Sequence, residues 1–164
     1  SDDGADNYVI PFMMELSPGC IPSDIAFDPQ DMLMVTCGGI NAILRLNITL
    51  AGADPVNVVF TGISTVSDPN NLIRNPLHIV SDGKLDGKNV PGGSMNLFVT
   101  VGDGNEAHPD SVLTLKSSDA YEPSKRSDVG LRPTGIATPY EGTKVFVSTE
   151  VSHSITTWDL EDLK

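Results

Sequence analysis

This sequence of 164 residues is poor in aromatic and basic residues and has no long apolar run. Lys and Arg number 10 against 22 Asp and Glu, so the formal net charge at pH 7 is −12. A chain this acidic repels phosphate backbones, which argues against nucleic-acid binding. No stretch approaches the roughly 20 apolar residues of a membrane-spanning helix. We therefore expect neither a nucleic-acid partner nor a membrane span.

Signatures of catalysis are also scarce. The chain has no Gly-x-Ser-x-Gly nucleophile elbow, and Gly102-Asp103-Gly104 lacks the spacing and the following helix of a phosphate-binding loop. Its three histidines match no zinc-ligand spacing. We assign no catalytic and no cofactor-binding residue from the sequence.

The residues that are present indicate β-structure. Apolar residues make up 39% of the chain, which suits a folded domain. Val, Ile, Thr and Phe gather in short runs between Gly, Pro, Asp and Ser, whereas helical spacing of apolar residues is rare. This pattern predicts an all-β fold.

One phrase occurs three times, at a period of about 55 residues, which is typical of repeat architectures. Its copies begin at Pro22, Pro76 and Pro133. After each proline come a short strand, a turn, a second apolar strand and a third strand. The second strands are Leu33-Met34-Val35-Thr36, Leu97-Phe98-Val99-Thr100 and Val145-Phe146-Val147-Ser148. Four short antiparallel strands per repeat describe a β-propeller blade.

The repeats predict a division of the chain into units. In the second unit the fourth strand is hard to recognise, because residues 119–130 are polar and contain Pro123. The third unit ends after its third strand. The predicted units are residues 1–19 (an N-terminal segment with an orphan fourth strand), 20–67 (blade 1), 68–131 (blade 2, with a loop insertion at 81–94) and 132–164 (blade 3 without its fourth strand).

Three blades are too few to close a ring, since known propellers have about four to eight. The chain begins with neither an initiator Met nor an apolar leader, as expected for a mature protein or an excised fragment. We therefore expect an incomplete ring, which protein partners or other copies of the chain complete.

The third repeat carries a family resemblance. Pro133-Thr134-Gly135-Ile136-Ala137, the strand Lys144 to Thr149, and Ser154 to Leu160 resemble the YVTN and NHL-like β-propeller repeats. The first unit resembles these repeats nearly as well. The resemblance covers roughly residues 20 to 164 and implies the propeller fold. It says little about function, because such propellers include enzymes, surface proteins and interaction platforms.

A shorter stretch, Asn96 to Asn105, is similar to a segment of soluble quinoprotein sugar dehydrogenases, which are also propellers. In that stretch and just after it, Asp103, Asn105 and Glu106 place oxygen ligands on a Gly-containing turn, a chemistry that suits Ca²⁺. Turn formation explains the same residues without a metal. Ca²⁺ is the one cofactor that the sequence suggests.

Cys20 and Cys37 lie where two adjacent antiparallel strands meet, and a disulfide between them would imply an oxidising compartment. The alternative is a pair of buried free thiols. Asn47-Ile48-Thr49 is a glycosylation sequon, although such short matches also arise by chance. These features predict a secreted, extracellular or periplasmic protein.

Two classes of function remain open. The first is a non-catalytic, secreted or cell-surface propeller that serves as a protein-interaction or assembly scaffold. The second is part of a secreted propeller enzyme, lactonase-type or quinoprotein dehydrogenase-like, with its site at the central channel. The lack of a catalytic set favours the scaffold.

Overall fold

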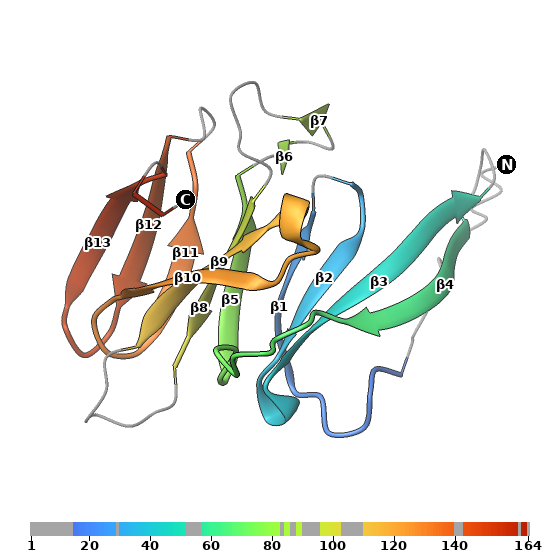
Figure 1. The fold of residues 1–164 in the computed structure, drawn as a ribbon, viewed down its shortest axis with the longest axis horizontal. Helices are drawn as coiled ribbons and strands as arrows, with labels where there is room; N and C mark the ends of the chain where they lie inside the picture. The colour runs from blue at the N-terminus through green and yellow to red at the C-terminus, as the bar shows by residue number, and fades with distance from the viewer. Residues whose placement is uncertain are drawn as a thin grey trace, which may run out of the picture.

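The structure is a computed structural model that describes residues 15–28, 30–51, 57–82, 84–85, 88–89, 96–102, 110–139, 143–160 and 162–163. Nearly all regular structure in these ranges is β, and Figure 1 shows three antiparallel sheets side by side in chain order. The two helices are short 3₁₀ turns, η1 (Gly38–Ile40) and η2 (Ser117–Asp119). Among the described residues, no helix has the length and apolar character of a membrane span.

The first sheet is an antiparallel meander in which each strand pairs with the next. Its strands are β1 (Pro22–Phe27), β2 (Leu33–Cys37), β3 (Ala42–Ala51) and β4 (Asn57–Thr65). The turn between β1 and β2 is held by Asp28, whose Oδ1 accepts hydrogen bonds from the N–H groups of Gln30 and Met32 at 2.8 Å each. Such an Asx turn explains why the chain reverses just after Asp28.

The second sheet repeats this order with an inserted hairpin. Its strands are β5 (Pro76–Ser81), β8 (Asn96–Val101), β9 (Ser111–Lys116) and β10 (Pro123–Asp128). Between β5 and β8, the strands β6 (Lys84–Leu85) and β7 (Lys88–Asn89) pair with each other.

Strand β10 is the one that the sequence pattern does not clearly indicate. Among the described strands it is the outermost of its sheet and pairs only with β9, so it needs few apolar residues. Arg126 of β10 still reaches inward, and its Nε donates to Ser111 Oγ at 2.7 Å.

The third sheet has the strands β11 (Pro133–Ala137), β12 (Lys144–Thr149) and β13 (Ser154–Asp159). Among the first strands of the three sheets, β5 lies between β1 and β11 and neighbours both. The sheets thus radiate from a shared inner edge, as propeller blades do, and they do not close a ring. The predicted all-β, blade-type fold with an open ring is confirmed.

The strand registers define equivalent positions in the three sheets. Met34, Phe98 and Phe146 lie at one position of the second strand, opposite Ala26, Val80 and Ala137 of the first. We call the face that carries these three residues the forward face, because in the first two sheets it packs on the following sheet. The opposite face, which carries Val35, Val99 and Val147, is the rear face.

Each pair of neighbouring sheets encloses an apolar core. Met34 and Ile43 of the first forward face pack with Ile79, Val99 and Leu113 of the second rear face. Phe98 and Val112 of the second forward face pack with the third sheet through Val145 and Val147. The second sheet is therefore covered on both sides, which explains why every residue of β8 is buried.

Candidate functional site: the joint between sheets

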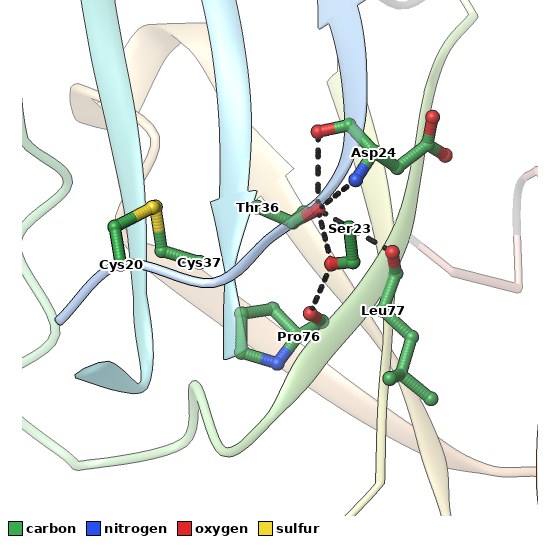
Figure 2. The surroundings of a disulfide bond; sticks show 7 residues. All are labelled: Cys20, Ser23, Asp24, Thr36, Cys37, Pro76 and Leu77. Carbon is green, nitrogen blue, oxygen red and sulfur yellow. Dashed lines mark hydrogen bonds between the residues drawn. A yellow bond between two sulfur atoms is a disulfide. The ribbon is translucent and has the colours of Figure 1, made fainter. Parts of the chain in front are cut away.

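A pair of hydroxyl groups joins the inner edges of the first two sheets, as Figure 2 shows. Ser23 Oγ on β1 lies 2.9 Å from Thr36 Oγ1 on β2 and donates to the carbonyl oxygen of Pro76, on the next sheet, at 2.9 Å. Thr36 Oγ1 also accepts the N–H of Asp24 at 2.9 Å and lies 3.3 Å from the carbonyl oxygen of Leu77. The hydroxyl pair thus links two strands of one sheet to the first strand of the next.

A carboxylate reinforces this joint. Asp24 Oδ2 accepts the N–H of Ile79, on β5, at 3.0 Å. His78 Nδ1 lies 3.7 Å from the same oxygen, and both side chains are about one-third exposed. Asp24 and His78 are therefore neighbours on the inner strands of two adjacent sheets.

A side-chain clasp occurs at both joints between sheets. Asn41, just before β3, accepts the N–H of Asn75, just before β5, at 2.7 Å through Oδ1. Asp110, just before β9, accepts the N–H of Arg132, just before β11, at 2.7 Å through Oδ2. Asn75 and Arg132 both have positive φ, 40° and 55°. Equivalent positions thus make the same contact twice, so the clasp belongs to the repeat.

A partly buried ionic cluster connects the outer parts of the first two sheets. Asp28 is fully buried and lies 3.4 Å from a terminal guanidinium nitrogen of Arg45 on β3. The Arg45 guanidinium lies 5.3 Å from the centre of the Tyr121 ring, which belongs to the second sheet's β9–β10 connection. Burial raises the pKa of Tyr121 well above its ordinary value, and the negative charge of Asp28 raises it further. Tyr121 is therefore held as a neutral phenol.

The third sheet carries the same joint elements without a following sheet among the described residues. Thr134 and Ser148 stand at the positions of Ser23 and Thr36, and their hydroxyl oxygens lie 3.1 Å apart. His153, just before β13, stands at the clasp position of Asn41 and Asp110 and is exposed.

The apolar part of this third forward face is exposed. Phe146 is 36% exposed, although its equivalents Met34 and Phe98 are fully buried. Ile155, opposite Ser148, is 70% exposed, whereas its equivalents Ile43 and Val112 are fully buried. The third sheet thus presents a forward face of the kind that the other two sheets bury.

The predicted disulfide is present. Cys20 is bonded to Cys37, with their Cα atoms 4.9 Å apart, and it fastens the segment before β1 to the end of β2 (Figure 2). The disulfide lies next to the hydroxyl pair, because Cys37 follows Thr36, and it holds together the same two strands, β1 and β2, that the pair joins. A disulfide is consistent with an extracellular location.

The remaining predicted site residues stay predictions. Asp103, Asn105 and Glu106, the proposed Ca²⁺ ligands, lie outside the described residues. Within the described ranges, no group of three or more His, Cys, Asp or Glu side chains is arranged to hold a metal ion. Asn47 is exposed on β3, where it pairs with Gly62.

Sequence reasoning missed the joint itself. Ser23, Thr36 and Thr134 are ordinary strand residues, and Ser23 and Pro76 lie 53 positions apart. The available signal was the hydroxyl residue at the end of each second-strand phrase, Thr36, Thr100 and Ser148.

Comparison with known proteins finds no matching family model and no matching curated protein. Among solved structures, the chain is similar to a catalytically inactive virginiamycin B lyase from Staphylococcus aureus with quinupristin, at 18% identity and a TM-score of 0.45 over 89% of this chain and 43% of that one. It is also similar to a protein described as a 6-phosphogluconolactonase from Bacteroides uniformis, at 13% identity and a TM-score of 0.43 over 84% of this chain and 50% of that one. The chain thus spans half or less of the length of these two proteins.

The fold of this chain follows from its own strands and contacts. Three antiparallel sheets follow one another, their first strands meet at the inner edge, and both joints have the same side-chain clasp. This chain has a β-propeller-type fold with an open ring.

Proposed function

We propose that this protein is a non-catalytic β-propeller scaffold that assembles with other polypeptides through the forward face of its third sheet. The observation that carries the proposal is the exposure of Phe146 and Ile155, whose equivalents in both other sheets are fully buried. The repeats, on this proposal, are of the YVTN/NHL-like type that the phrases at Pro133 and Pro22 resemble.

Leaving such an apolar face in water costs free energy. Burying a Phe or Ile side chain contributes about 1.5–3 kcal/mol. A contiguous apolar face rimmed by polar groups is a common mark of a protein-interaction surface. Here the rim is the hydroxyl pair Thr134–Ser148 on one side and the ion pair between Lys144 Nζ and Asp159 Oδ1, 2.7 Å apart, on the other.

The proposed setting is secreted or cell-surface. The Cys20–Cys37 disulfide supports it, because reducing compartments keep most thiols free. The acidic composition suits a protein that stays dispersed until it meets its partner.

The test compares complexes that tagged variants recover from the protein's natural surroundings. Native mass spectrometry should find a polypeptide partner, either another copy or a different protein, on the wild type. Ile155→Asp places a charge on the face and should lose that partner. Val151→Asp is the matched control, since Val151 is an exposed apolar residue of the β12–β13 turn. Equal recovery by all three proteins, or no partner on any of them, would refute the proposal.

A second candidate function is supported by the Asp24–His78 pair. An imidazole beside a carboxylate is a pairing that general-base catalysis uses, and these two residues lie on inner strands. A lactonase-type propeller enzyme would place its site there. Proton release from simple γ- and δ-lactones measures this activity. Turnover that His78→Ala abolishes would support the enzyme, and wild-type rates equal to the buffer rate would remove this candidate.

A further inference from the structure

The two ends of the row of sheets expose opposite faces. The third sheet exposes its forward face, through Phe146 and Ile155. The first sheet exposes the inner part of its rear face, where Ile25 is 60% exposed. In each joint inside the chain, a forward face packs on a rear face. The exposed parts of the two end faces are thus of the two kinds that pack together within the chain, although on the first rear face Val35 and Leu44 are already buried.

Residue positions on the first sheet support this match. Ile25 pairs with Val35, just as Ile79 pairs with Val99 in the second sheet. Ile79 is only 4% exposed, because the forward face of the first sheet covers it. Phe27, two residues beyond Ile25, is also exposed. The rear face of strand β1 therefore carries apolar residues like those that β5 buries, but no other sheet of the described residues packs on them.

The polar contacts of the joint have counterparts on the same two faces. Thr134 and Ser148 correspond to the hydroxyl pair that binds the Pro76 and Leu77 carbonyl groups. On the first sheet, Pro22 begins β1 as Pro76 begins β5, so its carbonyl group stands at the position that such a hydroxyl pair binds. A further joint would repeat these polar contacts of the first one.

On the basis of the proposed scaffold function, we propose that the partner is a second copy of this chain, bound head to tail. The forward face of one copy's third sheet covers the inner rear face of the other copy's first sheet. Thr134 and Ser148 then donate to the carbonyl groups of the second copy's Pro22 and Ser23. This contact continues the joints that the chain already makes between its own sheets.

The number of copies follows from the number of sheets. A head-to-tail contact produces either a closed ring or an open filament. Propellers close with about four to eight blades. The three sheets of strands β1–β4, β5 with β8–β10, and β11–β13 among the described residues make six sheets from two copies of this sequence, and no other number of copies falls in that range. The inference is a closed dimer with two identical joints.

Analytical ultracentrifugation of the purified, oxidised chain tests the dimer over a wide range of protein concentration. The wild type should approach twice the mass of one chain. Ile155→Asp removes the burial of one Ile at each joint, so it should raise the dissociation constant by on the order of a hundredfold. Val151→Asp should dimerise as the wild type does. Because Ile155 is exposed in the single chain, Ile155→Asp should keep the wild-type circular dichroism spectrum.

A mixing experiment distinguishes a head-to-tail joint from other contacts. Ile25→Asp damages the rear face and Ile155→Asp the forward face, so each variant alone should be monomeric. An equimolar mixture regains one intact joint and should form a mixed pair. If Ile25→Asp alone remains a dimer, the contact joins two third sheets and the inference is wrong.

Salt provides a further readout. Each copy carries a formal net charge of −12, so repulsion opposes the dimer at low ionic strength. Added salt screens this repulsion and should lower the dissociation constant. A dissociation constant that rises with salt would show a joint held by opposite charges, which contradicts the apolar joint proposed here.

The outcomes separate this inference from the proposed function. A wild type that is monomeric at every concentration overturns the dimer. If that monomer still recovers a different polypeptide that Ile155→Asp loses, the scaffold function stands and only the identity of the partner is wrong.

Discussion

Two phenylalanines at equivalent positions should respond very differently to truncation. Phe98 and Phe146 each follow a Val or Leu in the second strand of their sheets and precede a Val. Phe98 is fully buried between the second and third sheets, whereas Phe146 lies 36% exposed on the third forward face. The two sites have the same residue type and the same place in the strand, and they differ in whether another sheet packs on the side chain.

The expected magnitudes follow from that difference. Phe98→Ala leaves a cavity between two sheets and should lower the free energy of unfolding by about 3–5 kcal/mol. Phe146→Ala opens no enclosed cavity, since its site faces solvent, and should cost about 1 kcal/mol. The two variants should therefore differ by roughly 2–4 kcal/mol.

The assay is urea unfolding followed by far-ultraviolet circular dichroism, with the disulfide intact. Protein concentration is kept low, so that any association through the third sheet does not protect Phe146. The slope of the unfolding free energy against urea concentration should be the same in both variants and the wild type, so that their unfolding midpoints can be compared. Equal losses for the two variants would refute the view that the third forward face is uncovered in the single chain.

Three further predictions concern the joint and its surroundings. Replacement of both Cys20 and Cys37 by Ala should lower the free energy of unfolding by about 3 kcal/mol, because the bond closes a loop of 17 positions; denaturation of oxidised wild type against the variant measures this. Thr36→Val keeps the side-chain shape but leaves the Asp24 N–H without its acceptor, so urea unfolding should show a loss of about 1–3 kcal/mol, with the exposed Thr157→Val close to neutral. The raised pKa of Tyr121 makes stability fall as pH rises above the ordinary value of 10.0, because the unfolded phenol ionises there and the folded one does not. This fall should be at most about 1.4 kcal/mol per pH unit, and Tyr121→Phe should remove it. An identical pH dependence in both proteins would contradict the neutral, buried phenol.

Much of the blade architecture could be predicted from local sequence. Strands such as Leu97–Thr100 are apolar at nearly every position, because they are buried on both faces, and turns such as Asp28–Asp31 have unmistakable chemistry. The Cys20–Cys37 bond was also predictable, since antiparallel pairing brings the start of one strand to the end of the next. β10 was harder to recognise, because an outer strand needs few apolar residues.

The joint could not be predicted in the same way. A hydroxyl on a strand looks alike in sequence whether it faces water, as Thr157 does, or reaches a carbonyl group on another sheet, as Ser23 does. The contact depends on how two sheets pack, and the partners are far apart in the chain. The Asn41–Asn75 clasp was hidden for the same reason.

The sequence by itself determined the repeats, the strands within them and the disulfide, because these depend on side-chain periodicity, turn chemistry and pairing between neighbours in the chain. Only the tertiary structure decided which apolar faces are covered. Phe98 and Phe146 occupy the same place in the same phrase, yet one is enclosed and the other is exposed. Burial depends on whether another sheet packs against the face, and that information lies in the spatial order of the sheets rather than in the phrase.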